Sequence, residues 1–204
     1  MNYIITIGRQ LGGGGKQISE ALSQRLGIPC YDKELIQIAS RESGLGKEFF
    51  ENFDEKSSHR FFGTYFGFRS GFMGDSNYLG NETLFKIQSD VIKELAEKES
   101  CIFVGRCADY ILRNHPQCFN VFICARKQDR IERISAAQNI SQREAAVLIE
   151  QTDKKRTDYY NYYSNKVWGM ATSYDLCVNS SVFSMDAIIA MIEEYVLSRY
   201  YNKE

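Results

Sequence analysis

Short continuous apolar runs alternate along the chain with longer segments whose apolar residues recur every three or four positions. Runs of the first kind are typical of buried strands, and segments of the second kind are typical of amphipathic helices. The predicted strands are residues 4–7, 28–31, 100–104, 119–124 and 175–178. The predicted helices are residues 16–26, 33–40, 84–98, 108–113, 127–138, 141–158 and 184–200. This alternation implies an α/β protein with a mostly parallel sheet that is covered by helices on both faces.

Several predicted helices carry boundary signals. Gly27 follows the helix at 16–26 and suits its C-terminal end, because glycine adopts a left-handed conformation at low cost. Asp32 is placed to cap the helix at 33–40. Ser141 and Glu144 form the pattern of a capping box at the start of the helix at 141–158. These signals support the boundaries that the apolar pattern predicts.

Residues 41–82 break this pattern. The segment combines many glycines with many aromatic residues. The stretch 59–69 is too apolar for an ordinary solvated loop and too rich in glycine for a strong helix. We interpret the segment as an inserted, mobile part of the chain that covers something. The role of residues 55–82, and whether they are ordered without a ligand, is left open. No internal repeat and no linker divides the chain, so a single domain is predicted.

The charge and the apolar runs of the chain give no sign of a nucleic-acid or membrane partner. The chain has 204 residues and a formal net charge of −1, which gives no sign of nucleic-acid or acidic-membrane binding. Its longest apolar runs are far shorter than the ~20 residues that span a bilayer. The amino terminus has no basic segment and no small-residue cleavage site, so a cytoplasmic location without a signal peptide is expected. The oligomeric state, monomer or homodimer, is open.

The six cysteines and two histidines give no metal-binding pattern. The cysteines are scattered without a CxxC pair, and neither histidine belongs to a motif. Because zinc ligands usually come as closely spaced Cys and His pairs, we assign no metal site to protein residues. Most of the cysteines lie in apolar, strand-like runs, where we expect reduced thiols and no disulfides.

A run of glycines separates the first predicted strand from the first predicted helix. Glycines let backbone N–H groups turn inward around an anion, and the start of a helix adds a favourable dipole. Lys16 follows the run and supplies a positive charge for phosphate groups. A ligand-free turn would gain nothing from so many glycines, so we favour a phosphate-binding loop. The predicted phosphate-binding residues are Gly12, Gly13, Gly14, Gly15, Lys16 and Gln17.

The loop departs from the pattern GxxxxGK[ST] of P-loop proteins at two positions. Gln10 stands in place of the first glycine, and Gln17 stands in place of the serine or threonine. In the pattern that hydroxyl contacts magnesium. Here the hydroxyl is either that of Ser19 or is missing.

Six segments in order along the chain resemble the cytidylate kinase-like family. They are ITIGRQ at 5–10 with the glycine run, YDKELI at 31–36, VGRCAD at 104–109, DKKR at 153–156 with two tyrosines at 159–160, WG at 168–169 and YDLC at 174–177. The resemblance spans nearly the whole chain. It implies a three-layer α/β/α P-loop kinase fold with a five-stranded parallel sheet, a helical insert and a lid. The implied core is 1–40, 96–149 and 171–204, the acceptor-binding insert is 41–95, and the lid is 150–170.

The resemblance also implies roles for individual residues. Lys16, Arg106 and Arg156 are the expected catalytic residues, with Lys16 on the donor phosphates, Arg106 on the acceptor and Arg156 on the lid. The expected substrate-binding residues are Asp32, Arg106, Asp109, Asp153 and Arg156. Cytidylate kinases have Gly-Arg-Asp where this chain has Gly105-Arg106-Cys107, so the acceptor base is an open question.

The expected activity is ATP-dependent phosphoryl transfer to a nucleoside monophosphate of the CMP type or a related small molecule, with ATP and Mg²⁺ as cofactors. Such transfer needs positioning and charge neutralisation more than covalent chemistry from the protein. Two alternatives stay open. One is a nucleotide- or phosphate-binding regulatory protein without turnover, and the other is a kinase for a small molecule that is not a nucleotide. The tyrosines between 159 and 163 are expected to pack the lid helix rather than stack on a base.

Overall fold

The computed structural model describes residues 2–32 and 76–201. Met1–Lys33 and Leu95–Glu204 together form one compact unit, and Glu34–Glu94 form a second. The helix expected at 33–40 and most of the segment expected to cover another part of the molecule lie outside the described residues. The division into core, insert and lid therefore stays a prediction.

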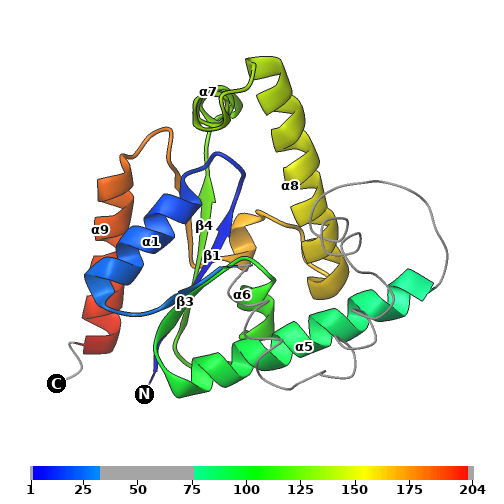
Figure 1. The fold of residues 1–204 in the computed structure, drawn as a ribbon. Coiled ribbons are helices and arrows are strands. Elements are labelled where there is room, and N and C mark those ends of the chain that lie inside the picture. The colour runs from blue at the N-terminus through cyan, green and yellow to red at the C-terminus, as the bar shows by residue number, and fades with distance from the viewer. Residues whose placement is uncertain (1, 33–75, 202–204) are drawn as a thin grey trace. The chain divides into compact units, whose positions relative to one another are not determined.

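The first unit is built on a sheet of five parallel strands (Figure 1). The strands are β1 (Ile4–Arg9), β2 (Cys30–Tyr31), β3 (Cys101–Val104), β4 (Cys118–Cys124) and β5 (Leu176–Asn179), in the order β2-β3-β1-β4-β5. Ile4 lies opposite both Cys101 and Cys118, so β1, β3 and β4 start in register and run toward the same edge. The parallel five-stranded sheet that the sequence predicts is confirmed.

One face of the sheet is covered by α1 (Gly15–Leu26) and α9 (Met185–Val196), which lie side by side in Figure 1. Their apolar stripes meet the alternate residues of the central strands, as expected for strands buried on both faces. The side chains buried together here include Ile5, Ile7, Ile18, Leu22, Ile102, Val121, Ile188 and Ile192. A short π-helical turn, Leu197–Tyr201, continues the chain after α9.

The other face carries α6 (Ala108–Ile111) and the C-terminal part of α8 (Gln142–Ser164) with the segment that follows it. Phe122 of β4 meets the ring of Trp168 edge-on at 5.3 Å and lies 4.9 Å from the ring of Tyr174. Helix α8 begins with the predicted capping box but runs past the expected end at 158. It continues because Tyr160, only 4% exposed, adds another buried residue to the helix.

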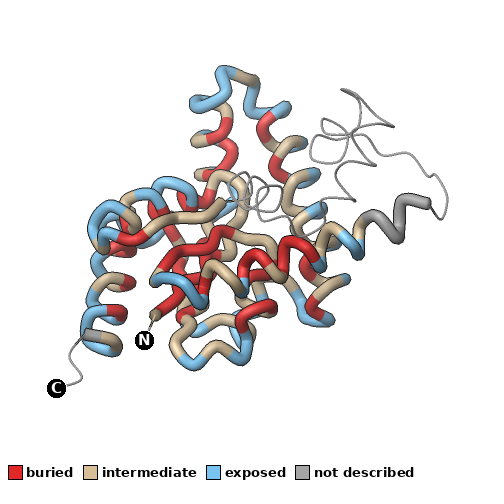
Figure 2. The backbone as a smooth tube through the Cα atoms, turned by 60° about the horizontal axis from the view of Figure 1, so that its bottom comes forward, coloured by how far each residue is buried: buried red, intermediate tan, exposed pale blue. Residues whose placement is uncertain are grey.

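Helix α7 (Lys127–Gln138) packs against the first half of α8 through Ile131, Ile134, Ala145 and Ile149. Figure 2 shows that most of the turn between these two helices is exposed. Helix α5 (Ser76–Lys98) starts in the second unit, earlier than the predicted residue 84, and its last residues belong to the first unit. No helix among the described residues is both long enough and apolar enough to span a membrane.

Candidate functional site

The glycine run forms a tight loop between β1 and α1. Gly12 and Gly14 adopt left-handed conformations, with φ of 76° and 84°, which glycine tolerates best. A Cβ at Gly12 would lie 2.9 Å from the backbone oxygen of Arg130, so a larger residue has no room there. Gly14 precedes α1 without a side-chain cap, and the first turn of α1 holds no acidic residue. The N–H groups of this turn are therefore suited to an anion.

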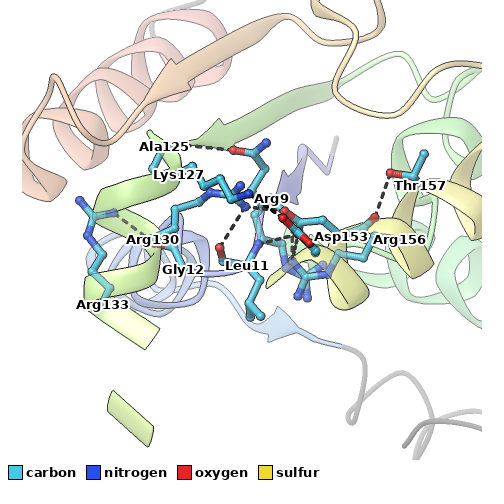
Figure 3. Close-up of polar contacts among 12 residues, drawn as sticks. Arg9, Leu11, Gly12, Ala125, Lys127, Arg130, Arg133, Asp153, Arg156 and Thr157 are labelled. Atoms are coloured by element: carbon cyan, nitrogen blue, oxygen red, sulfur yellow. Dashed lines mark hydrogen bonds and ion pairs between the residues drawn. The ribbon is translucent and has the colours of Figure 1, made fainter. Parts of the chain in front are cut away.

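The carbonyl groups of the loop are held from outside by side chains of other elements. Arg130 and Arg133 of α7 donate to the oxygens of Leu11 and Gly12, at 3.3 and 3.2 Å (Figure 3). The Ser180 hydroxyl, which follows β5, donates to the oxygen of Gly13 at 2.8 Å. These bonds fix the loop in shape without engaging the N–H groups at the start of α1. No motif in the sequence points to these three residues, although Arg130 and Arg133 are spaced to share one face of a helix.

Gln10 has a structural role at the position where P-loop proteins carry glycine. Its side-chain Oε1 accepts a hydrogen bond from the N–H of Ala125 at 3.1 Å, and its own N–H donates to Ile123 at 3.0 Å. These bonds tie the start of the loop to the end of β4. The glutamine therefore supports the loop from the side of the sheet.

The Lys16 ammonium and the Ser19 hydroxyl, which the sequence suggests as phosphate or magnesium contacts, do not point toward the loop. The Lys16 side chain is 73% exposed, and its Nζ lies 3.8 Å from Glu20 one turn along α1. Gln17 is exposed. The Ser19 hydroxyl is buried and donates to the oxygen of Lys16 at 2.7 Å. An exposed pair such as Lys16 with Glu20 contributes less than about 1 kcal/mol, so the lysine is free to change partner, whereas Ser19 is committed to the helix.

Arg106 sits on an unusual turn directly after β3. Gly105, Arg106 and Cys107 all have positive φ, at 78°, 58° and 56°. For a residue with a side chain this conformation costs on the order of 1 kcal/mol or more, and such strain is often found at functional sites. The turn carries the Arg106 guanidinium over the ring of Tyr159, 5.5 Å from its centroid. Cys107 is buried, and burial raises the pKa of its thiol, so it stays neutral.

Helix α8 is fastened to the glycine loop by Asp153 and Arg156 (Figure 3). Asp153 accepts a hydrogen bond from the N–H of Leu11 at 2.9 Å, forms an ion pair with Arg130 and lies 3.8 Å from Arg156. Arg156 donates to the backbone oxygen of Arg9 at 2.8 Å. Burial lowers the pKa of Arg156, while the Asp153 carboxylate opposes that change. In this structure the helix expected to be a lid is already docked on the loop.

A cavity of about 60 Å³ lies between these parts, at the carboxyl edge of the sheet. Its walls include three arginines, Arg9, Arg106 and Arg156, together with the aromatic residues Tyr159, Tyr160, Trp168 and Tyr174. Asp109 also lines it and accepts a hydrogen bond from the Tyr160 hydroxyl at 2.7 Å. Burial raises the pKa of Asp109, and the bond from Tyr160 partly offsets this.

Some of the residues expected at the site line the cavity, and the others lie elsewhere. Arg106, Asp109 and Arg156 share the cavity. Asp153 lies at the glycine loop instead, and Lys16 is turned to solvent. Asp32 follows β2, and its negative charge favours the charged form of Arg9. Tyr160 and Tyr174, which line the cavity, stack on each other at 6.5 Å. Tyr159, also in the cavity wall, meets the ring of Tyr163 edge-on.

The parallel sheet with helices on both faces and a glycine loop after β1 is the fold of P-loop kinases. A shikimate kinase from Bacteroides thetaiotaomicron has a TM-score of 0.52 to this chain, with 14% identity and coverage of 95% of this chain and 98% of its own. That likeness concerns the fold alone. A solved protein from Eubacterium ventriosum, described as uncharacterized, is more similar, with a TM-score of 0.74, 26% identity and coverage of 97% and 100%.

The family is shown by the sequence comparison. Residues 4–182 match the cytidylate kinase-like family, so the chain belongs to it. A cytidylate kinase from Methanocorpusculum labreanum is 28% identical over 108 residues. That match covers 52% of this chain and 59% of the relative, so it spans less than two thirds of the relative's length.

Proposed function

We propose that this protein transfers a phosphoryl group from ATP to a nucleoside monophosphate of the CMP type or a related small molecule. The observation that carries the proposal is the placement of Arg106 and Arg156 in one cavity beside a preformed glycine loop. Membership of the cytidylate kinase-like family supports it. Phosphoryl transfer depends mainly on holding two charged substrates in line and neutralising the group that moves, and these are the chemical means that the cavity and loop offer.

Each part of the site has a role in this proposal. The N–H groups at Gly14, Gly15 and the start of α1 bind donor phosphates, and Lys16 leaves Glu20 to join them. Arg106, on the rigid end of β3, binds the acceptor. Arg156, on α8, neutralises the transferring phosphoryl group. Trp168 and the tyrosines exclude water from the cavity, which limits loss of the phosphoryl group to hydrolysis.

Magnesium would accompany ATP and reduce the charge of its phosphates. Among the described residues, no group of three or more His, Cys, Asp and Glu side chains could hold a metal ion. The Ser19 hydroxyl is bonded within α1, and position 17 carries an amide. We assign magnesium no ligand from these residues and expect the nucleotide phosphates and water to supply most of its coordination.

The acceptor is to be found by experiment, because Cys107 replaces the aspartate of cytidylate kinases. A buried neutral thiol is a weak hydrogen-bonding group and does not substitute for a carboxylate. The test is release of ADP from MgATP over a panel of CMP, UMP, AMP, GMP, nucleosides and small alcohols. Turnover with any nucleoside monophosphate supports the proposal, and turnover with alcohols alone supports the kinase for a non-nucleotide. Absence of turnover with every acceptor contradicts both.

Two variants then assign the arginines. Arg106→Ala should mainly raise the acceptor KM, because a residue on the rigid core binds ground state and transition state alike. Arg156→Ala should mainly lower kcat, by about 10²–10³, the usual effect of removing one electrostatic donor. Arg113→Ala is the matched control, because Arg113 is exposed outside the cavity and bonded to the backbone oxygen of Tyr110. Unchanged kinetics in both cavity variants would remove these residues from the active site.

A second candidate is a nucleotide-binding regulatory protein without turnover. The state of Lys16 and Ser19 favours it, because neither group is directed at the loop. Calorimetric titration of ATP with and without Mg²⁺ separates the candidates when combined with the ADP assay. Binding without ADP release supports the regulatory protein, and absence of binding at millimolar ATP contradicts both candidates. A cytoplasmic location and the state of monomer or homodimer stay predictions.

A further inference from the structure

The direction of the Arg9 side chain is fixed by two glycines from different elements. A Cβ at Gly15, the first residue of α1, would lie 2.6 Å from the Cβ of Arg9. A Cβ at Gly105, after β3, would collide with the Nη1 of Arg9. The arginine stem therefore crosses the start of α1, and its guanidinium rests on the turn that carries Arg106. Any side chain at either glycine would displace it.

The guanidinium of Arg9 lies close to two other positively charged side chains. It lines the cavity together with Arg106 and Arg156. Burial and the positive charges of Arg156 and Arg106 lower the pKa of Arg9. The negative charge of Asp32 acts in the opposite direction but does not cancel the decrease. Within the described residues, the side chain of Arg9 makes no hydrogen bond or ion pair. Its backbone oxygen, by contrast, accepts the bond from Arg156.

Three guanidinium groups around a small cavity repel one another, and a bound anion would turn that repulsion into attraction. A phosphoryl group offers three acceptor oxygens and, because its second pKa lies near 6, nearly two negative charges at pH 8. Guanidinium groups match its oxygens with paired N–H donors. A neutral hydroxyl or amide would leave the repulsion in place.

We propose that Arg9 is a third phosphate-binding arginine of the site, which helps to hold a phosphoryl group as a dianion beside Arg106 on the acceptor side or beside Arg156 on the donor side. This deepens the proposed function and rests on it for the reaction in which that group takes part. The binding itself needs neither ATP nor turnover. The phosphoryl group belongs either to the acceptor or to the donor, and the chemistry that recognises it is the same.

The test measures binding of inorganic phosphate by calorimetry at pH 8 to the full chain and three variants. Arg9→Met keeps the apolar stem across Gly15 and removes the guanidinium. Arg9→Lys keeps a positive charge without the paired donors, and Arg113→Met is the control outside the cavity. We expect Arg9→Met to raise the phosphate Kd about 10- to 100-fold, the usual worth of a hydrogen bond to a charged group. Arg9→Lys should lie between wild type and Arg9→Met, and Arg113→Met should match wild type.

The melting temperature without phosphate separates binding from a structural role. Removing one of three repelling charges should leave that temperature unchanged or raise it in Arg9→Met. Dimethyl phosphate, which carries a single charge, should bind weakly to every variant. An unchanged phosphate Kd in Arg9→Met overturns the proposal, and so does a clear fall in the melting temperature of both Arg9 variants with proportional loss of binding. An equal loss of binding in Arg113→Met overturns it as well.

Repeating the titration with ADP bound distinguishes the two sources of the phosphoryl group. If Arg9 still governs phosphate binding, the residue acts on the acceptor side. If ADP abolishes the Arg9-dependent binding, the residue acts on donor phosphates. Both results support the proposal. Failure of ADP release with every acceptor would contradict the proposed kinase while leaving Arg9-dependent phosphate binding intact, so the two hypotheses fail separately.

Discussion

Asp153 connects helix α8 to the glycine loop through two contacts of its carboxylate. One carboxylate oxygen accepts the N–H of Leu11 in the glycine loop, and the other forms an ion pair with Arg130. The side chains of Arg130 and Asp153 are only 9% and 15% exposed. The Nε of Arg130 is also buried without a partner among the described residues, so Asp153 is the main compensation for that guanidinium. Removing the carboxylate would leave a buried positive charge and an unpaired N–H.

The expected cost follows from these contacts. Breaking a buried ion pair by removing one partner typically destabilises a protein by about 3–5 kcal/mol. For a chain of this size, 1 kcal/mol corresponds to roughly 2–4 °C in melting temperature. We therefore expect Asp153→Ala to lower the melting temperature by at least about 6 °C. Asp153→Asn should cost less, because an amide oxygen still accepts the N–H of Leu11.

The same helix provides the control. Asp158 pairs with Lys154 on α8, and both side chains are mostly exposed, at 61% and 76%. An exposed pair of this kind contributes about 0–1 kcal/mol, so Asp158→Ala should leave the melting temperature almost unchanged. Differential scanning calorimetry on both variants tests the argument. If Asp153→Ala lowers the melting temperature no more than Asp158→Ala does, the network does not hold α8 to the loop, and our reading of Asp153 is wrong.

Two further predictions concern the cavity. Because Arg106 has a φ of 58°, Arg106→Gly should be about 1 kcal/mol more stable than Arg106→Ala in urea unfolding. Both variants should lose acceptor binding to the same extent. Equal stabilities of the two variants would contradict backbone strain at this turn. Burial raises the pKa of Asp109, so the folded state holds that proton more tightly than the unfolded state does, and the resulting stability is lost as pH rises through the raised pKa. Asp109→Asn should therefore raise the melting temperature at pH 8 and change it little at pH 4. A larger gain at pH 4 than at pH 8 would contradict a raised pKa of Asp109.

Much of the fold could be predicted from the sequence because it depends on patterns that are local in the chain. Apolar runs of four to six residues mark the strands. Glycine at position 27 and the pair Ser141 and Glu144 mark helix ends that the structure confirms. Because the glycine run follows the first strand and precedes the first helix, it must form the connection between them at the carboxyl end of that strand. Order along the chain therefore determined the architecture and the position of the loop.

The sequence predicted only part of the site. Arg106 and Arg156, to which the family resemblance assigns roles in the reaction, both line one cavity, and those roles stay predictions. Lys16 follows the glycines, but in the first turn of α1 its side chain lies beside Glu20, one turn along the helix. That spacing of four is visible in the sequence, although the pairing was not predicted from it. Ser180 lies far from the loop along the chain, and no motif points to its bond with Gly13.

Arg9 shows most clearly what only the tertiary structure decides. Its place after a buried strand is read directly from the sequence, but a side chain at a strand end has several staggered directions open to it. The direction is set by contacts with Gly15 and Gly105, which come from other elements. Propensity and periodicity are properties of neighbours along the chain, whereas the field at Arg9 comes from Arg106 and Arg156, which lie 97 and 147 residues away in sequence. Such a charge cluster exists only once the sheet has brought its strand ends together.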